Sequence, residues 1–418
     1  MKRNYLIVFL ILLTFFVISF LTNILGALNP NVSASYTLTE TMAGFLPFAF
    51  FIAYGIMSIP SGFLLEKMGE KIMMMIAFGC AFIGAWIFAQ FPQFNVYVIS
   101  LFTIGAGMAA LQVVVNPLLR VAGGEEHFAF NLVLAQLVFG LASFVSPQMY
   151  TYLVTNIDQG NTEKPFIGLL SDLVPQDLSW VSVYWAFALM SFLMILIILF
   201  IKFPRVELQD DEKVGSKESY LELFKNKYVI LYFLGIFAYV GTEQGISYWM
   251  SKFLSNYHGF DPDTVGADAV SYFWGLMTIG GVLGLVLVKL FDSKLVLRWF
   301  TILAILSVLA GLFAGPNVAL WALPISGFFL SVMYPVIVSL GLNSVTKHHG
   351  SFAGILMSGI AGGAVVQILI GGLSDLFSLK IGMLLIFITL GYILSITFWA
   401  KPLVKNKTVN SFKDLIKA

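Results

Sequence analysis

The sequence predicts an all-α membrane protein in which twelve transmembrane helices form two pseudo-symmetric six-helix bundles. Three observations carry this prediction. Of the 418 residues, 59% are hydrophobic and only 11% are charged, whereas soluble domains contain about 25% charged residues. Apolar windows of about 20 residues, the length of a helix that crosses a bilayer, recur twelve times along the chain. A charged segment near the middle separates the first six windows from the last six.

The twelve windows follow one another with mostly short connections. The basic start at Lys2 and Arg3 followed by an apolar run is a feature that signal peptides share. The run continues past Asn23 to Ala27, however, so we interpret it as the first span. The spans are predicted at residues 5–27, 43–65, 72–91, 96–119, 128–154, 180–202, 228–254, 267–290, 295–314, 317–343, 351–373 and 381–400.

Two longer connections, 156–178 and 202–227, interrupt the short ones, and the second is the most charged stretch of the chain. It indicates the division into halves. We predict an N-terminal six-helix bundle at 1–202, a cytoplasmic linker at 203–227, a C-terminal six-helix bundle at 228–401 and a cytoplasmic tail at 402–418.

The lysines and arginines predict the orientation, because basic loops stay on the cytoplasmic side of a membrane. With the N-terminus inside, only Lys164, Lys252 and Lys380 of the 23 basic residues fall on the outer side. We therefore expect a multi-pass protein of the bacterial cytoplasmic (inner) membrane with both termini in the cytoplasm.

The composition also argues against several functions. A net charge of +1, with the lysines in short loops, is not the clustered basic surface that nucleic acid requires. The single cysteine, Cys80, excludes an intrachain disulfide and a Cys-based metal site. We find no His, Asp and Glu cluster with metal-ligand or catalytic spacing, so we predict neither an enzyme nor a resident metal or cofactor.

Glu243 is a carboxylate in the middle of the apolar run from Tyr228 to Leu254. A charge at such depth costs a few kcal/mol even on lenient insertion scales, so it normally faces a cavity, a partner or a ligand. Tyr239 and Ser247 lie four residues to either side and share its helix face. Such a carboxyl could carry a proton, coordinate Na⁺ when ionised, or serve only as a hydrogen-bonded structural group.

The other polar residues inside the spans are mostly amides. Amides with aromatic rings suit a neutral polyhydroxylated ligand, because each hydroxyl needs both a donor and an acceptor while an apolar ring face stacks on aromatic side chains. An amide clamp between helices is the alternative for each of them, and we favour that clamp, or a helix-end role, for Asn131, Asn343 and Gln367. The candidate ligand-binding residues are Asn23, Gln112, Asn116, Gln136, Gln244, Trp249 and Tyr334.

The loop after the second span, residues 62–71, resembles the Gly-x-x-x-Asp-Arg-x-Gly-Arg-Lys signature of the major facilitator superfamily. A related stretch follows the eighth span at 284–294. Charges in such loops lie at helix ends, where they can pair with neighbouring helices in one conformational state; ordinary loop charges are the alternative. The candidate gating residues are Glu66, Lys67, Gly69, Lys71 and Arg120.

Several further segments carry a more specific resemblance. They are Leu111 to Pro117, His127, Phe128, Asn131, Leu132, Phe139, Gly140, Tyr239 to Glu243, Tyr334, Pro335, Ser339 to Gly341, Gly362, Gly363, Ser374 and Asp375. Together these segments resemble one branch of that superfamily, the fucose–galactose–glucose:proton symporter family. The resemblance extends over nearly the whole chain and implies the major facilitator fold, a central cavity, alternating access, and a hexose or related sugar driven by a cation gradient.

The chain departs from the family's pattern at residues that matter for coupling. Acids that fucose-transporting members carry in spans 1 and 4 fall at Asn23 and Gln112, and an arginine of span 8 is replaced by Gly281. Amides cannot titrate, so Glu243, which resembles an acid of many other members, is the remaining candidate for cation coupling. H⁺ coupling, Na⁺ coupling and uncoupled transport all stay open.

We therefore expect a monomeric secondary active transporter, embedded in the lipid bilayer, that binds a neutral sugar between its halves and moves it by alternating access. Its coupling cation would be H⁺ or Na⁺, with Na⁺ held near Glu243. Two alternatives remain: transport of an amphiphile, a peptidoglycan fragment or a drug, and uncoupled sugar transport. A membrane sensor is disfavoured because the tail after Lys401 offers no signalling domain.

Overall fold

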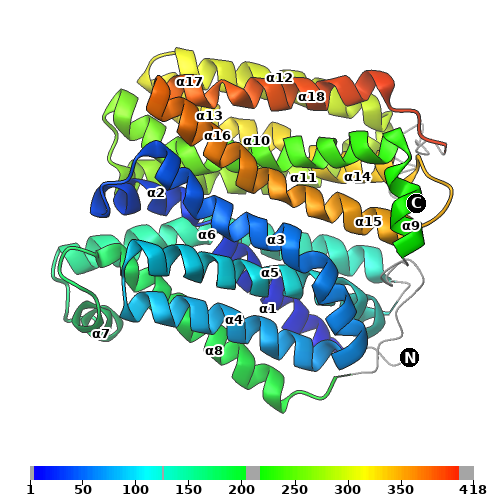
Figure 1. Cartoon of the computed structure of the whole chain (residues 1–418). Helices are drawn as coiled ribbons and strands as arrows, with labels where there is room; N and C mark the ends of the chain where they lie inside the picture. The colour runs from blue at the N-terminus through cyan, green and yellow to red at the C-terminus, as the bar shows by residue number, and fades with distance from the viewer. Residues whose placement is uncertain (1–3, 125–126, 204–216, 404–418) are drawn as a thin grey trace.

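The computed structural model describes residues 4–124, 127–203 and 217–403, and these residues form helices and turns without any strand. Twelve of the helical segments are long and apolar enough to cross a membrane, as the sequence predicts. They stack into two groups that follow the order of the chain, one built from blue to green segments and the other from green to red (Figure 1).

The first six spans comprise one broken helix, five continuous ones and a short helix in the long connection at 156–178. The elements are α1 (Tyr5–Thr22) with α2 (Leu25–Ser35), α3 (Glu40–Met68), α4 (Glu70–Gln90), α5 (Phe94–Gly123), α6 (Phe128–Asp158), the short α7 (Pro165–Leu173), the 3₁₀ turn η2 (Ser179–Val181) and α8 (Ser182–Phe200).

The last six spans contain more interruptions. A short helix, α9 (Lys217–Phe224), precedes them within the predicted linker. The elements are α10 (Lys227–His258), the π turn η3 (Pro262–Gly266) with α11 (Ala267–Leu290), α12 (Ser293–Phe313), α13 (Pro316–Leu330) with α14 (Met333–Leu342), α15 (His349–Ser358) with the 3₁₀ turn η4 (Gly359–Ala361) and α16 (Gly362–Leu376), and α17 (Leu379–Met383) with α18 (Leu385–Trp399).

The breaks are the main difference from the predicted spans. Span 1 breaks after Thr22 and then continues to Ser35, well past the predicted end at Ala27. Spans 10, 11 and 12 break near Ser331, Gly359 and Leu384. A hydropathy window measures apolar content over a fixed length, so it does not detect where the ladder of helical hydrogen bonds is interrupted.

The packing of helices repeats between the halves. In the first half α3 and α4 pack on α5, α4 packs on α8, and α1 packs on α6; in the second half α11 and α12 pack on α13, α12 packs on α18, and α10 packs on α16. Each pair in the first list has its counterpart six spans later. The predicted pseudo-symmetry of two six-helix bundles is therefore confirmed.

The halves contact each other through α3 against α16, α6 against α11, and α2 against α10. The first two contacts are equivalent under the repeat. We call the end of the molecule where α3 passes into α4 and α11 into α12 the basic end, because Lys67, Lys71, Lys289 and Lys294 lie there. The other end, where α2 passes into α3 and α16 into α17, is called the opposite end.

Lys71 and Lys294 occupy equivalent places in the two halves. The Lys71 ammonium donates to the carbonyl oxygens of Leu199 (2.8 Å) and Ile201 (2.9 Å) at the end of α8. The Lys294 ammonium donates to the Ala400 carbonyl oxygen (2.9 Å) at the end of α18. A cation at the C-terminus of a helix satisfies otherwise unpaired carbonyl groups and opposes the negative end of the helix dipole. The repeat seen in the loop sequences is thus also a repeat of structure.

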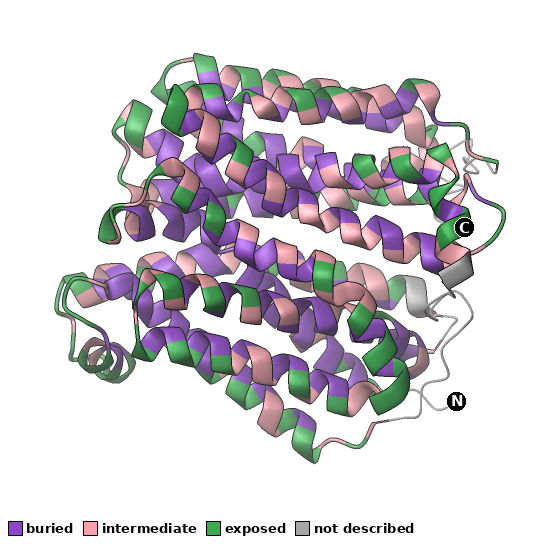
Figure 2. Cartoon of the chain, viewed as in Figure 1, coloured by how far each residue is buried: buried purple, intermediate pink, exposed green. Residues whose placement is uncertain are grey.

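Figure 2 shows buried residues where helices contact one another and exposed residues on the outward helix faces. Many of the exposed residues are large and apolar. Phe9, Ile99, Phe130 and Ile388 are each more than 60% exposed. In water such a surface would be an aggregation hazard, but it suits contact with acyl chains. The burial pattern therefore agrees with a membrane-embedded protein.

Candidate functional site

Glu243 lies near the midpoint of the 32-residue helix α10 and is half-buried. The Gln244 amide donates from Nε2 to Glu243 Oε1 at 3.1 Å, and the Tyr239 hydroxyl, one helical turn earlier, interacts with the same carboxyl group. Glu243 forms no ion pair with another described residue. The carboxyl is thus held by neutral donors at the middle of the membrane span.

Tyr334, at the start of α14, extends this cluster to a second helix. Its ring centroid is 5.8 Å from that of Tyr239, and its hydroxyl donates to the sulfur of Met357 at 3.1 Å. The structure therefore brings together three sequence candidates of the second half, Glu243, Gln244 and Tyr334, through the unpredicted Tyr239–Tyr334 contact.

Asn23 occupies the break between α1 and α2 and is buried. Its Nδ2 donates to Ser143 Oγ on α6 at 2.8 Å and lies 3.4 Å from Ser19 Oγ. Ser19 and Ser143 also bond to each other at 2.6 Å. In this conformation the amide links the broken first span to the fifth.

Gln112 and Asn116 on α5 and Gln136 on α6 behave differently. Gln112 is half-buried, whereas Asn116 and Gln136 are exposed, and none of the three side chains forms a hydrogen bond to another described residue. All three lie in the part of their helices toward the basic end. An amide exposed to lipid would lose its hydrogen bonds, so we interpret these positions as facing water.

Trp249, another candidate, is fully buried on α10. Its indole N–H donates to Gln367 Oε1 on α16 at 2.8 Å. Gln367 therefore acts as an interhelical clamp here, as expected. The nitrogen of the same amide, Nε2, is buried and has no hydrogen-bond partner among the described residues.

The candidate gating residues lie at the basic end. Gly69 ends α3 with φ of 77°, a conformation that glycine adopts without strain. Lys71 binds the end of α8, so its partner belongs to its own bundle. Glu66 and Lys67 are exposed and Arg120 is buried, and both Glu66 and Arg120 interact with neighbours.

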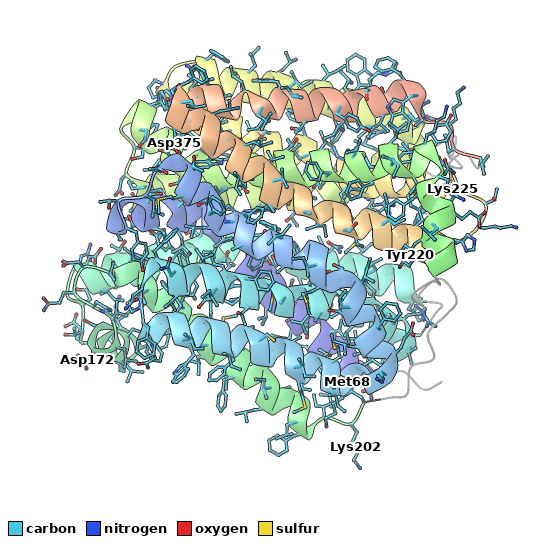
Figure 3. The ribbon with its side chains drawn as sticks, in the orientation of Figure 1. Met68, Asp172, Lys202, Tyr220, Lys225 and Asp375 are labelled. Atoms are coloured by element: carbon cyan, nitrogen blue, oxygen red, sulfur yellow. The ribbon has the colours of Figure 1, made fainter. Side chains whose placement is uncertain are left out.

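A set of hydrogen bonds joins the two bundles at the opposite end. Asp375, the one acidic residue of α16, accepts from the backbone N–H groups of Glu40 (2.7 Å) and Thr41 (2.8 Å) and from the Thr41 hydroxyl (2.5 Å). Figure 3 marks Asp375 where α16 approaches the start of α3. The carboxylate of one bundle therefore caps a helix N-terminus of the other, where unpaired N–H groups and the helix dipole favour a negative charge.

Asp263 in η3 forms a second junction. Its Oδ1 accepts from Asn31 Nδ2 (2.8 Å) on α2 and from the Tyr150 hydroxyl (2.5 Å) on α6, and its carbonyl oxygen accepts from the Thr151 hydroxyl (2.7 Å). Nearby, Gln148 Nε2 donates to the Asp268 carboxyl at 2.7 Å. Two helices of the first bundle are thus tied to the start of α11.

Lys252 forms the third junction. Its ammonium lies 2.6 Å from Glu40 Oε2 and 3.1 Å from Ser33 Oγ, and it is 8% exposed. We expected Lys252 on the outer side, near the end of the predicted span 228–254; the helix continues to His258, and the lysine is a buried inter-bundle group. An isolated lysine inside an apolar helix is the same signal that singled out Glu243, so the sequence already contained this information.

One groove of about 540 Å³ lies between α12 and α13, lined mainly by apolar side chains including Leu306, Trp321 and Phe329. None of the predicted site residues lines it. No group of three or more His, Cys, Asp or Glu side chains that could hold a metal ion gathers in the described ranges. The contacts described around Glu243 are hydrogen bonds from the neutral side chains of Gln244 and Tyr239.

Two repeated membrane bundles with polar groups at mid-depth, and with hydrogen bonds joining them at one end, are the arrangement on which membrane transporters are built. The comparisons with known proteins specify the class further. The family model of the Major Facilitator Superfamily matches residues 10–366, and the chain belongs to this superfamily.

The curated relatives cover nearly the full chain. The "Glucose/galactose transporter" of Brucella abortus is 28% identical over 390 residues, which is 91% of this chain and 90% of the relative. The "L-fucose-proton symporter" of Escherichia coli is 28% identical over 397 residues, covering 90% of this chain and 88% of the relative.

The solved structures agree on the fold. A crystal structure of the fucose:proton symporter FucP in an outward conformation superposes with a TM-score of 0.67 at 23% identity, covering 94% of this chain and 98% of FucP. A bacterial homologue of the lysosomal transporter Spinster, in an inward-facing conformation, superposes with a TM-score of 0.79 at 13% identity, covering 94% and 96%.

Proposed function

We propose that this transporter carries a neutral hexose or a closely related sugar inward together with a proton, by alternating access. The observation that carries the proposal is the position of Glu243 and the contacts of its carboxyl group. It is a half-buried carboxyl at the midpoint of a spanning helix, held by Gln244 and Tyr239 without an ion-pair partner among the described residues. Such a group can gain and lose a proton as its surroundings change between conformations.

The names of the relatives support a sugar as the substrate, since they are a glucose/galactose transporter and a fucose-proton symporter. The amides that face water, Gln112, Asn116 and Gln136, supply donors and acceptors without charge, as a neutral polyol needs. We assign the sugar to the space between these residues and the cluster of Gln244 and Tyr334. The assignment of Asn23 and Trp249 to the sugar is the weaker part of the proposal, because both are engaged with protein partners here.

The conformation suggests which side is accessible. The opposite end is joined by the Asp375, Asp263 and Lys252 junctions, whereas the exposed amides Asn116 and Gln136 lie toward the basic end. We place the basic end in the cytoplasm because lysine and arginine favour that side. The termini would then be cytoplasmic, the protein would reside in the bacterial inner membrane as a monomer, and the conformation described would face inward.

Uptake of labelled glucose, galactose and L-fucose into proteoliposomes tests the proposal. An inward proton gradient should drive accumulation of at least one of these sugars by the wild type. The variant Glu243→Gln keeps the hydrogen-bonding shape of the side chain but cannot titrate, so it should lose gradient-driven accumulation and retain sugar exchange without a gradient. The control Asp172→Asn, which neutralises an exposed carboxylate on α7 (Figure 3), should accumulate sugar like the wild type.

Three results would contradict the proposal. Full accumulation by Glu243→Gln would remove Glu243 from coupling. Accumulation driven by a Na⁺ gradient at equal pH on both sides would make Na⁺ the coupling cation. Absence of uptake and exchange of all three sugars by the wild type would reject sugar as the substrate.

A further inference from the structure

We propose that Gln367 is a sugar-binding residue of the conformation that opens toward the opposite end, where its Nε2 donates a hydrogen bond to a sugar hydroxyl. This inference rests on the proposed sugar transport and adds a residue on α16 to it. The proposal starts from an unpaired donor: Gln367 is fully buried, and its Nε2 has no hydrogen-bond partner in the structure described.

The orientation of the Gln367 amide follows from its partner. An indole N–H can only donate, so the Gln367 atom 2.8 Å from Trp249 Nε1 must be the oxygen. The nitrogen is then the group left over. Because Trp249 is itself fully buried, the amide is held in place by a rigid side chain, and Nε2 cannot exchange positions with Oε1 without breaking that bond.

Gln367 lies at the interface between α3 and α16, and these helices must separate when the transporter opens toward the opposite end. A Cβ atom placed on Gly44 of α3 would lie only 2.6 Å from the Gln367 carbonyl oxygen, so the backbones of α3 and α16 are in close contact there. One turn earlier Gly363 lies against Phe51 of α3, and one turn later Gly371 lies against Glu40. Gln367 shares this face of α16, because residues four apart lie above one another on a helix.

Along the membrane normal, Gln367 lies between the opposite end and the cluster of Glu243, Gln244 and Tyr334. Gln367 precedes Asp375 by eight residues, which is about 12 Å along a helix. Gly363, one turn toward the basic end, lies against Gln244, the neighbour of Glu243. A ligand entering from the opposite end, once the Asp375 junction has opened, would therefore meet Gln367 before it reaches Glu243.

The chemistry of the unpaired Nε2 group determines which kind of ligand Gln367 can bind. A neutral amide N–H recognises an oxygen acceptor without selecting for charge, which fits a sugar hydroxyl. A buried donor without an acceptor is unfavourable, and Gln367 Nε2 is in this condition while the backbones of α3 and α16 are in close contact. Separation of α3 from α16 would relieve it by admitting water or a sugar. Gln367 would thus bind sugar in one conformation and be withdrawn from it in the other.

Sided transport measurements can separate a sugar contact from an effect on the conformational balance. The variant is Gln367→Met, which keeps the length of the side chain and removes the amide. Half-saturating sugar concentrations are measured in right-side-out and inside-out membrane vesicles, with the most readily transported hexose. Loss of one neutral hydrogen bond should raise the value at the opposite end about 3- to 10-fold and leave the value at the basic end unchanged.

Monodeoxy derivatives of the same hexose identify the contact. One derivative should bind the wild type more weakly by a similar factor and be unaffected by Gln367→Met, because the hydrogen bond is already missing. The control is Gln148→Met, whose amide already donates to Asp268 across the same interface. Gln148→Met should lose affinity for each monodeoxy derivative by the same factor as the wild type does.

Two outcomes would overturn the inference while the proposed sugar transport stands. Equal half-saturating concentrations for the wild type and Gln367→Met on both sides would show that the amide does not touch sugar. Weaker apparent binding on one side with a matching gain on the other would show that Gln367 only shifts the population of the two conformations. Failure of the wild type to transport any hexose would instead reject the proposed function.

Discussion

Asp375 shows that a single side chain can supply several of the hydrogen bonds that join the two bundles at the opposite end. Its carboxylate accepts three hydrogen bonds from Glu40 and Thr41 at the start of α3, although the side chain is exposed. The Thr39 hydroxyl accepts from the N–H of Met42 in the same turn. The first turn of α3 is thus capped partly by its own bundle and partly by the other one.

Removing this inter-bundle cap should favour opening at the opposite end. Loss of a helix cap costs about 1 kcal/mol, which corresponds to a factor of about five in a conformational equilibrium. We predict that Asp375→Ala increases the alkylation rate of a cysteine at the buried position Val32 about five-fold, with an impermeant maleimide applied from that side. The single native cysteine is first replaced by Cys80→Ser.

The matched control for this measurement is Asp177→Ala, which removes an exposed carboxylate near the same end of the molecule. It should leave the alkylation rate unchanged. An equal rate for Asp375→Ala and the parent would mean that the cap contributes nothing to closure.

At the scale of the helices, the two lysines at the basic end act as equivalent clamps. Lys71 holds the end of α8 and Lys294 holds the end of α18. Each contact joins two helices of one bundle, so its loss should weaken that bundle without affecting the other. Favourable interactions of cations with helix C-termini contribute about 0.3–1 kcal/mol at exposed positions.

We predict that Lys71→Met and Lys294→Met each lower the melting temperature in detergent slightly, and that the double variant shows the sum of the two shifts. Additivity is expected because sites without shared partners act independently. The control Lys67→Met, an exposed lysine four residues from Lys71, should cause no shift. A double variant no less stable than either single one would contradict the equivalence of the two clamps.

At the scale of the whole molecule, the contacts of α3 with α16 and of α6 with α11 are equivalent under the repeat. The two bundles can therefore rock about this shared interface, and opening one end closes the other. The hydrogen bonds of the opposite end, including the buried pair of Lys252 and Glu40, must break in that motion. Such a pair is costly to leave half-formed, so the closed end should open as a unit.

Distances between spin labels test this motion in the Cys80→Ser background. One pair, Phe200→Cys and Leu295→Cys, reports on the basic end, and the other, Phe91→Cys and Phe377→Cys, reports on the opposite end; all four side chains are exposed. A sugar or a pH change that lengthens one distance should shorten the other. Changes of the same sign at both ends would contradict rocking of two rigid bundles.

Much of the architecture was predictable because a bilayer imposes simple rules. A spanning helix must be apolar for about 20 residues, so composition and length predicted twelve spans. The charged connection at 202–227 predicted their grouping into two bundles, and the related loops at 62–71 and 284–294 indicated the repeat. The same rules made Glu243 conspicuous, since a carboxyl at mid-membrane is costly. The structure leaves its coupling role as a prediction.

The sequence by itself determined the helices, the two-bundle organisation and the polar residues that interrupt the apolar spans, because these depend on the local balance between lipid and water. Only the tertiary structure decided which polar residues meet. Asp375 capping α3, Lys252 pairing with Glu40, and Gln367 bonding to Trp249 each join residues more than 100 positions apart in the chain. Such pairs depend on how two bundles dock in one conformation, and a side chain's chemistry does not specify its partner.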